Sequence, residues 1–263
     1  MKVPVYIISL ASAAHRRTFQ EAQAQSLGFE PIWSEAVGIQ DISDAFFYQH
    51  AFQWQRALKK TEVACFMSHL QLWRIIASGT TPAVVLEDDV ILGGNWFDDV
   101  QQLSMQAKAD MICLEAWGKK ILGVSQLIGP LQLRRLRLNS AGAAGYILWP
   151  SGARRLLSRY EHHGVALADA FINQTPYWSV WQLVPANVVQ MSVANEYGLS
   201  APVHGDSLIA REIHASAVAP NMSVICQMKW RRIKGELNKA WRRMAIPLFA
   251  KRDYVSYLSH LHR

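Results

Sequence analysis

The sequence predicts an α/β sandwich around a mostly parallel sheet, with a basic C-terminal helical appendage. Apolar, β-rich runs alternate with amphipathic helical stretches as far as about residue 185, a pattern that is typical of stacked strand–helix units. The chain has 263 residues, of which 51% are hydrophobic, so it can bury a substantial core without disulfides. We expect one α/β domain over residues 1–205 and a basic, partly amphipathic tail over residues 206–263.

The beginning of the chain predicts a strand–helix–strand unit. Residues 3–10 form an apolar, β-rich run, Ser12 is the expected cap of the next helix, and Gly28 is its expected end. The run "FEPIWSEAV" then predicts a second strand. The opening run lacks the long apolar segment and the cleavage site of a signal peptide, so we expect a strand there. Two strands separated by one helix are typical of a parallel sheet.

The middle of the chain continues this alternation. After an irregular or locally helical stretch over residues 38–60, Thr61 is the expected cap of an amphipathic helix that ends at Gly79. "TPAVVLE" predicts the third strand, "NWFDDVQQLSMQAK" a helix, and "DMICLEAW" the fourth strand. The glycine-containing, basic residues 118–140 predict either a hairpin or a mobile loop.

The last part of the predicted domain contains one more strand and two helices. Small residues open the strand "GAAGYILWP", which precedes a helix that Ser151 is expected to cap. A short helical stretch then starts at Asp169. Of the three cysteines, Cys65 and Cys113 lie in apolar runs and are expected to be small core residues. The cysteines show no CxxC spacing, so we expect no disulfide framework and no zinc ribbon.

Three carboxylates stand at the end of a predicted core strand in "VVLEDDVIL". Glu87, Asp88 and Asp89 follow two valines and a leucine, although charged side chains are seldom buried without a partner. In open α/β sheets, ligands bind beyond the carboxyl ends of the strands. Carboxylate oxygens suit Mg²⁺ or Mn²⁺, and these ions commonly contact substrate phosphates as well. The pattern indicates a metal–phosphate site, with an acidic turn as the alternative.

Other polar residues have both a functional and a structural interpretation. Arg16 and Arg17 lie one turn into the first helix, where they suit bidentate contacts with a diphosphate or form a solvated helix face. His69, beside Ser68, is the kind of helical histidine that is more often a satisfied core or surface residue than a ligand. For Asp169, local sequence favours a plain N-cap. No P-loop and no GxGxxG pattern occurs, which argues against Walker-type hydrolases and a typical dinucleotide fold.

Four blocks, in order, resemble glycosyltransferase family 25, the lipooligosaccharide glycosyltransferases of Gram-negative bacteria. They are "VYIISLASAAHRR", "LKKTEVACFMSHLQLWRII", "AVVLEDDVIL" and "AGAAGYILWPSGARRLL", the last followed by Asp169, and they cover about residues 3–190. Two positions depart from the family pattern, because Ser9 stands where Asn is frequent and Ala64 where Gly is frequent. The resemblance implies a GT-A-like nucleotide-binding fold with an acidic, DxD-like metal motif.

The resemblance also implies roles for individual residues. The implied metal ligands for Mn²⁺ or Mg²⁺ are Glu87 and Asp89, completed by His204 or His214. Asp169 is the implied general base, and Glu115, at another predicted strand end, is the second candidate. The implied donor-binding residues are Arg16, Arg17, Ser68, His69, Asp88, Gly142 and Gly145. For the two glycines, a turn and tight sheet packing are the alternative.

The implied reaction is an inverting hexose transfer that gives a β-linkage. The donor is a UDP-sugar, with UDP-galactose as the first expectation and UDP-glucose as the next. The acceptor is a lipid-linked oligosaccharide in lipopolysaccharide synthesis. This reaction requires one general base to deprotonate the acceptor hydroxyl.

The basic tail suggests where the protein acts. "MKWRRIKGELNKAWRRMAIPLFAKR" alternates Trp, Ile and Leu with basic residues, as interfacial helices do on anionic lipid. A basic helix packed on the domain is the alternative. No apolar run approaches the roughly 20 residues that span a bilayer. We therefore expect a cytoplasmic protein that is peripheral on the cytosolic face of the bacterial inner membrane.

Two other functions compete with the transferase. The net charge of +7 and the tail suit a basic nucleic-acid-binding protein. That function explains neither the acidic strand end nor the four ordered blocks, so we expect no nucleic-acid partner. A catalytically inactive, glycosyltransferase-like scaffold is the other alternative.

Overall fold

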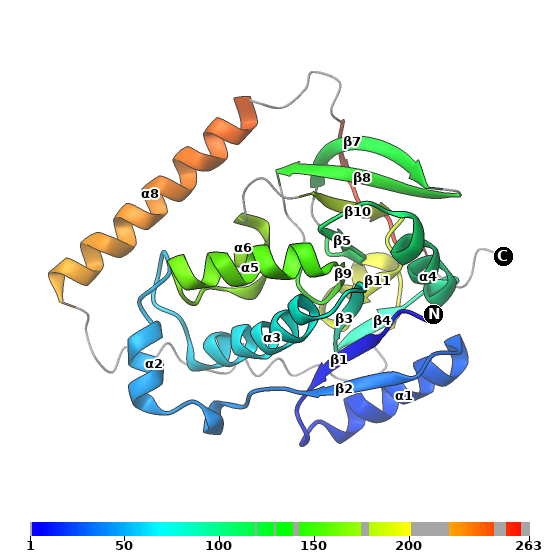
Figure 1. Ribbon diagram of the computed structural model, residues 1–263, viewed down its shortest axis with the longest axis horizontal. Coiled ribbons are helices and arrows are strands. Elements are labelled where there is room, and N and C mark those ends of the chain that lie inside the picture. Colours follow the sequence, from blue (N-terminus) through cyan, green and yellow to red (C-terminus); the bar gives the residue numbers. More distant parts are fainter. Residues whose placement is uncertain are drawn as a thin grey trace.

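A nine-stranded sheet forms the centre of the computed structural model (Figure 1). The structure describes residues 2–118, 120–128, 130–138, 142–174, 179–200, 221–244 and 251–258. The strands, in sheet order, are β12 (Lys251–Tyr254), β7 (Lys120–Ile128), β8 (Leu131–Leu138), β10 (Val180–Val184), β5 (Met111–Cys113), β9 (Gly145–Leu148), β3 (Ala83–Glu87), β1 (Val5–Ser9) and β2 (Pro31–Glu35).

The direction of the strands confirms the predicted fold class. β1, β2, β3, β5, β7 and β10 run the same way, whereas β8, β9 and β12 run the opposite way. The pairing is therefore mixed, since β9 lies between β5 and β3 and is antiparallel to both. The carboxyl ends of β1, β2 and β3 meet at one edge of the sheet, because these three strands are parallel neighbours.

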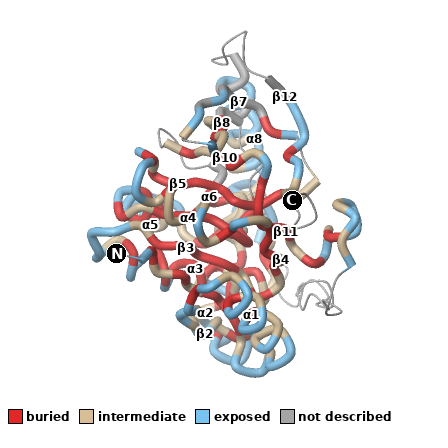
Figure 2. The backbone as a smooth tube through the Cα atoms, turned by 90° about the vertical axis from the view of Figure 1, so that its right-hand side faces the viewer, coloured by how far each residue is buried: buried red, intermediate tan, exposed pale blue. Residues whose placement is uncertain are grey.

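Two helical layers cover the sheet. One layer is α1 (Ala14–Leu27) and α4 (Trp96–Gln106), and the other is α3 (Lys60–Ser78), α5 (Pro150–His163) and α6 (Ala168–Gln174). Successive side chains of β3 point to the two layers in turn. Val84 and Leu86 belong to the core under α1 and α4, whereas Val85 belongs to the core under α3. Figure 2 shows the buried residues gathered in the strands between these helices.

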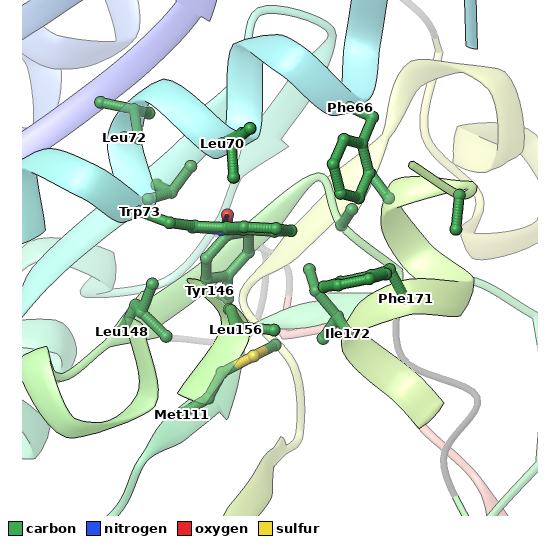
Figure 3. Packing of buried hydrophobic residues seen from close by; sticks show 14 of the residues in the cluster. Phe66, Leu70, Leu72, Trp73, Met111, Tyr146, Leu148, Leu156, Phe171 and Ile172 are labelled. Carbon is green, nitrogen blue, oxygen red and sulfur yellow. Dashed lines mark hydrogen bonds between the residues drawn. The ribbon is translucent and has the colours of Figure 1, made fainter. Parts of the chain in front are cut away.

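Aromatic side chains fill the core under α3. Trp73 is fully buried and stacks on Phe171 of α6 with ring centroids 5.7 Å apart, and Phe66 meets Phe171 edge to face at 5.0 Å. Tyr146 of β9 lies beside Trp73 (Figure 3). Such pairs stabilise a core beyond the area that they bury. This packing fixes the side of α3 that carries His69 against the strands.

A second, small sheet adjoins the carboxyl ends of the strands. It has the order β4 (Val90–Leu92), β11 (Val188–Gln190) and β6 (Glu115–Ala116). The predicted strand "DMICLEAW" is thus split between two sheets, with β5 in the large one and β6 in the small one. Leu114 lies at the junction, where its N–H donates to Gly145 O and its carbonyl accepts from Val188 N–H.

The predicted helix caps are wrong at three positions. The serine or threonine caps were expected at Ser12, Thr61 and Ser151, whereas the observed N-caps are Ala13, Lys59 and Trp149. At the start of α3, Glu62 in the first turn accepts the N–H of the N-cap residue Lys59 with its Oε2 at 2.8 Å. The predicted stop of the first helix is confirmed, since Gly28 adopts the left-handed conformation with φ of 74°.

Residues 118–140 contain a hairpin, which was one of the two expectations for them. β7 and β8 pair as antiparallel neighbours and join the large sheet through β10. β12 adds to the other side of β7, and the backbone N–H and carbonyl of Ala186 bond to Ser256 and Leu258. The last part of the predicted tail therefore belongs to the main sheet. The predicted boundary at residue 205 lies outside the described residues and stays a prediction.

The remaining helices lie at the margins of the fold. They are η1 (Ile39–Asp41), α2 (Asp44–His50), η2 (Met191–Tyr197) and the long α8 (Met222–Met244). α8 runs along one side of the molecule, apart from the layered core (Figure 1). Among the helices described, none combines the length and the apolar character needed to cross a membrane.

Candidate active site at the carboxyl end of β3

The three consecutive carboxylates at the end of β3 have three different environments. β3 pairs with β1 on one side and with β9 on the other, and its last residue, Glu87, is held by a backbone hydrogen bond from its N–H to Ala144 O at 2.9 Å. A turn at Asp88 and Asp89 then leads directly into β4. The turn directs successive side chains to different neighbours.

Asp88 points into the protein. Its Oδ2 accepts a hydrogen bond from Ser9 Oγ at 2.7 Å, and its Oδ1 accepts one from Arg16 Nη1 at 2.9 Å. Gln20 Nε2 also donates to its carbonyl oxygen at 2.9 Å. Asp88 is buried, and both of its carboxylate oxygens are engaged by β1 and α1. This arrangement ties α1 to the end of the sheet, whereas the predicted contact of Asp88 with the donor stays a prediction.

Arg17 is engaged at the same edge of the sheet. Its Nη2 donates to Ser9 O at 3.0 Å and to Glu35 Oε2 at 2.7 Å, and its guanidinium lies over the Trp33 ring. Glu35 is exposed, so this ion pair contributes little to stability. The structure thus places Arg16 and Arg17 together beside the acidic strand end, and their predicted diphosphate contacts stay a prediction.

Glu87 is half-buried and held from two sides. Its Oε1 lies 3.2 Å from Nε2 of the fully buried His69, and its Oε2 accepts from Gln190 Nε2 at 3.3 Å. His69 belongs to α3, which precedes β3 in the sequence, and Gln190 belongs to β11, which follows it. Hydrogen bonds from two elements that are far apart in the chain therefore orient this carboxylate.

Asp89 has the least compensated charge of the three. Its Oδ1 is buried and has no hydrogen-bond partner among the described residues. Burial, followed by the negative charge of Glu87, raises the pKa of Asp89 to about 7, although Arg16 acts in the opposite direction. A proton or a cation at this carboxylate would remove the cost of burying an unpaired charge.

Glu115 adds a buried carboxyl group behind this edge. Its Oε2 accepts the Ala144 N–H at 3.1 Å, while Oε1 has no partner among the described residues. Burial raises the pKa of Glu115 well above its usual value, and the charge of Glu87 adds to the effect. A Cβ atom at Gly142 would collide with the Glu115 carboxylate, so glycine is what allows this close approach.

Asp169 lies in the first turn of α6, where its Oδ1 accepts the Ala170 N–H at 2.6 Å. It is half-buried, and its negative charge contributes to the raised pKa of both Cys65 and Glu115. It also contributes to the raised pKa of Arg56. The predicted metal carboxylates and both predicted bases therefore gather around one place, although they come from three separate segments of the chain.

Other predicted donor residues are engaged in packing. Ser68 is buried, accepts the Val37 N–H at 2.9 Å and donates to Ala64 O at 2.9 Å. A Cβ at Gly145 would lie 2.7 Å from Val188 Cγ1, which fits the alternative of tight sheet packing. Nothing in the structure tests their contact with a donor. His204 and His214 lie outside the described residues.

Sequence reasoning missed two residues of the site. Cys65 was expected to be a core residue, but it is only half-buried, and its thiol lies with His69 and Glu87 in a group whose ligand atoms are within 4.8 Å of one another. The four-residue spacing of Cys65 and His69 on a helix would have revealed their shared face. Gln190 gave no such signal, because it stands 103 positions from Glu87. Cys113 is fully buried as expected, and all three cysteines are free.

This chain belongs to glycosyltransferase family 25 (LPS biosynthesis protein), whose sequence profile matches residues 2–172. It is similar to the lipooligosaccharide biosynthesis protein lic2B of Haemophilus influenzae, with 27% identity over 209 residues, which is 70% of this chain and 75% of that protein. The expected resemblance is confirmed. The family description names lipopolysaccharide biosynthesis, and the name of this relative refers to lipooligosaccharide biosynthesis.

Other relatives carry a different description. The "probable inactive glycosyltransferase 25 family member 3" of Rattus norvegicus is 26% identical over 186 residues, and the one of Bos taurus is 30% identical over 125 residues. These matches cover 64% and 44% of this chain but only 32% and 20% of the relatives, so the chain spans a third of their length or less. A solved mannose-1-phosphate geranyltransferase from Thermus thermophilus superposes with a TM-score of 0.36 at 9% identity, over 76% of this chain and 80% of that one, which is too distant to support an argument.

Proposed function

We propose that this chain is a metal-dependent, inverting glycosyltransferase that moves a hexose from a UDP-sugar to a hydroxyl group of a lipooligosaccharide or lipopolysaccharide acceptor. Family membership and the relative lic2B support the transferase and the acceptor class. The single observation that carries the metal site is the buried Oδ1 of Asp89, which has no hydrogen-bond partner among the described residues and stands beside the carboxylate of Glu87 at a strand end.

The residues at the end of β3 fit a divalent cation. Their carboxylate oxygens are the hard ligands that Mn²⁺ and Mg²⁺ prefer. Burial, together with the nearby negative charge of Glu87, raises the pKa of Asp89, and a bound cation would offset both effects. Asp89 and Glu87 would hold the ion, and His204 or His214 remains the proposed further ligand. When bound, such an ion neutralises charge that develops on the leaving UDP.

Asp169 is the proposed general base. A base must reach the acceptor hydroxyl and take its proton, and Asp169 is half-buried whereas Glu115 is only 1% exposed. Each carboxylate accepts one backbone N–H, that of Ala170 for Asp169 and that of Ala144 for Glu115, so these bonds do not distinguish the two. Exposure therefore favours Asp169, and Glu115 stays the second candidate. The proton moves from the acceptor oxygen to the Asp169 carboxylate while that oxygen bonds to the anomeric carbon of the donor sugar. The bond from this carbon to the phosphate oxygen breaks at the same time, and UDP leaves with the electron pair.

The donor is proposed to be UDP-galactose, with UDP-glucose next, bound in a GT-A-like manner. Arg16 and Arg17 are the proposed contacts of the diphosphate, because both guanidiniums stand at the edge of the sheet that carries Glu87 and Asp89. Arginine suits this role, since its fork of N–H groups matches phosphate oxygens. Ser68, His69, Asp88, Gly142 and Gly145 support the same edge from within the protein.

α8 is the proposed contact with an anionic membrane on the cytosolic leaflet. Trp230, Ile233, Leu237 and Trp241 are all exposed, and their spacing of three and four residues places them on one face of the helix. The exposed Lys229 and Lys234 border this apolar stripe, and other side chains of α8 face the domain, where Arg231 Nη1 donates to Phe52 O at 2.8 Å.

Apolar and basic residues side by side suit an interface with anionic lipid. The alternative expectation, a helix packed on the domain, describes only one side of α8, because the stripe faces away from it. Such contact would bring the enzyme to its lipid-linked acceptor. The helix is thus the proposed reason for a peripheral position on the inner membrane.

An inactive, scaffolding protein is the second candidate function. The observation that favours it is the description of the mammalian relatives as inactive. A nucleic-acid-binding function is favoured by the net charge of +7 and by the basic C-terminal tail. The two carboxylates at the end of β3 would repel a nucleic acid backbone, so we propose no nucleic-acid partner.

One screen tests the proposed function. A panel of UDP-sugars is incubated with the protein and Mn²⁺, with and without lipooligosaccharide, and the release of UDP is measured. We expect UDP release that depends on Mn²⁺, is greatest with UDP-galactose and increases with acceptor. No UDP release from any donor would favour the scaffold, and salt-sensitive DNA binding without UDP binding would favour the nucleic-acid function.

A further inference from the structure

A series of buried polar groups leads from the aromatic core to the candidate site. Trp73 Nε1 lies 3.0 Å from the hydroxyl oxygen of Tyr146, this oxygen lies 2.9 Å from His69 Nδ1, and His69 Nε2 lies 3.2 Å from Glu87 Oε1. Trp73, Tyr146 and His69 are all completely buried. Figure 3 shows Trp73 and Tyr146 within the packed core. Polar groups in such a place are costly unless each has its partner.

The donor and acceptor chemistry fixes the direction of every bond in this series. The indole nitrogen of Trp73 can only donate, so the Tyr146 oxygen accepts from it. A tyrosine hydroxyl has a single proton, and the nearest remaining partner is His69 Nδ1, which therefore accepts. The proton of the neutral imidazole then resides on Nε2 and points at the Glu87 carboxylate. All groups are satisfied in this arrangement.

The last bond of this series holds the Glu87 carboxylate in place. Its Oε1 accepts the His69 N–H, and its Oε2 accepts the Gln190 side-chain N–H at 3.3 Å. Each carboxylate oxygen can accept two hydrogen bonds or metal contacts, so each retains capacity for a ligand. Hydrogen bonds behind a ligating group hold its orientation and tune its affinity.

We infer that Trp73, Tyr146 and His69 form a hydrogen-bond relay that positions Glu87, with His69 as a neutral Nε2–H donor and not as a ligand. The inference rests on the proposed function in one respect only, namely that Glu87 faces a cation. The assignment of the His69 tautomer rests on the hydrogen bonds with Trp73 and Tyr146 and does not depend on a cation at Glu87. Tyr146 is then a positioning residue at a distance from the reaction, because it acts on Glu87 through His69.

A competing use of His69 is a soft metal site. Cys65, His69 and Glu87 present one sulfur, one nitrogen and one oxygen atom within 4.8 Å of one another, which is a ligand set that Zn²⁺ accepts. That site needs a free lone pair on His69 Nε2. The proton would move to Nδ1, and the Tyr146 hydroxyl, which already accepts from Trp73, would then have no acceptor for its own proton in this series. The relay therefore fits the buried hydrogen bonds better.

Two measurements test the relay. The first is ¹⁵N NMR of the His69 side chain in the wild-type protein, which identifies the protonated nitrogen without any variant. The second is a Mn²⁺ titration, followed by electron paramagnetic resonance, of the wild type, Tyr146→Phe and a control. Tyr160→Phe is the matched control, because Tyr160 is half-buried and packs on Phe66 with ring centroids 5.9 Å apart, outside the relay.

We expect the Nε2–H tautomer in the wild type and a loss of this preference in Tyr146→Phe. We also expect Mn²⁺ affinity to fall about 10-fold in Tyr146→Phe, in the range found for groups that orient metal ligands. Tyr160→Phe should keep both properties. A merely structural role of Tyr146 would alter stability without changing the tautomer of His69.

Other outcomes separate this inference from the proposed function. If the wild type binds no Mn²⁺, the proposed metal site fails, but an Nε2–H signal from His69 still supports the relay. A wild-type His69 that is protonated on Nδ1 would overturn the relay even if Mn²⁺ binds. Zn²⁺ binding that is accompanied by an Nδ1–H signal and is lost in Cys65→Ser would likewise overturn it, in favour of the soft metal site.

Discussion

The end of β3 and helix α8 carry opposite charges and are held in opposite ways. Glu87, Asp88 and Asp89 lie where two sheets and two helices meet, and Asp88 alone takes hydrogen bonds from three residues. α8 is basic and presents Trp230 and Trp241 to solvent with exposures of 63% and 71%. The strand end is thus fixed by its surroundings, whereas most of the outer face of α8 makes no contact with the described part of the protein.

This difference fits the two kinds of partner proposed for these regions. A rigid acidic site in which Asp89 Oδ1 has no partner among the described residues suits a small cation and its phosphate ligand. An exposed apolar stripe with lysines at its border suits a broad surface that tolerates variation, such as anionic lipid. Substitutions should therefore act sharply at the strand end and gradually on α8.

The largest expected effect is on the transfer reaction. Asp169→Asn keeps the shape of the side chain but removes its ability to take a proton, so we expect the transfer rate to fall by about 10²–10⁴-fold. Binding of UDP with Mn²⁺ should remain, because Asp169 is not a proposed ligand of either. Steady-state kinetics and calorimetry measure the two properties. Normal transfer by Asp169→Asn, together with loss in Glu115→Gln, would assign the base to Glu115 instead.

The next largest effect concerns stability at the strand end. Asp88→Asn removes the carboxylate charge that pairs with the partly buried Arg16, so we expect the free energy of unfolding to fall by about 2 kcal/mol. Asp44→Asn is the matched control, because the Asp44 side chain is 81% exposed and pairs with Lys60 at the surface. Such a pair should contribute less than about 1 kcal/mol. Urea denaturation measures the free energy of unfolding of both variants. An equal decrease in Asp88→Asn and Asp44→Asn would contradict the structural role of Asp88.

Asp89 should give stability a distinctive dependence on pH. Its folded pKa of about 7 exceeds its ordinary value of 3.8, so the native state binds more protons than the unfolded state between these values. This carboxyl group therefore lowers the free energy of unfolding as pH rises from about 4 to 7. Asp89→Asn removes that contribution.

In metal-free buffer, Asp89→Asn should consequently gain stability over the wild type at pH 8, and the gain should shrink toward pH 5. Asp98→Asn, a change at an exposed carboxylate of α4, should show no such trend. Urea denaturation at both pH values measures the difference. A gain that is the same at pH 5 and pH 8 would contradict the raised pKa of Asp89.

The smallest effect is expected on α8. Trp241→Ala should weaken binding to vesicles with anionic lipid by about fivefold, since interfacial binding follows the apolar area that is buried. Met105→Ala is the matched control, because Met105 is 71% exposed on α4, away from the stripe. Activity toward a soluble acceptor should stay unchanged in both variants. If Trp241→Ala bound vesicles as well as the wild type, the proposed contact of α8 with anionic lipid would be contradicted.

The sequence predicted the elements of the fold better than their ends. Long periodic segments such as α3 were recognisable, because apolar residues at helical spacing mark one face. The small sheet was missed, since strands as short as Glu115–Ala116 have no periodicity to recognise. The cap of α3 was misplaced because the helix begins at Lys60 with Lys59 as its N-cap, and Glu62 binds the Lys59 N–H from the first turn.

The candidate site was predictable in composition but not in orientation. The acidic run placed Glu87, Asp88 and Asp89 together, yet it held no information that Asp88 turns toward Ser9, which is 79 positions away. The role of Gln190 at Glu87 depends equally on packing between distant segments. Sequence patterns identify which groups lie at a strand end, whereas tertiary contacts decide which of them remain free for a ligand.

The most direct test of the central claim is a Mn²⁺ titration of the wild type, Asp89→Asn and Asp98→Asn, followed by electron paramagnetic resonance. We predict one bound Mn²⁺ for each wild-type chain in the presence of UDP, the same for Asp98→Asn, and a loss of affinity of at least about 10-fold for Asp89→Asn. Mn²⁺ binding that is equal in all three proteins, or absent from the wild type with UDP, would contradict a cation site at the end of β3.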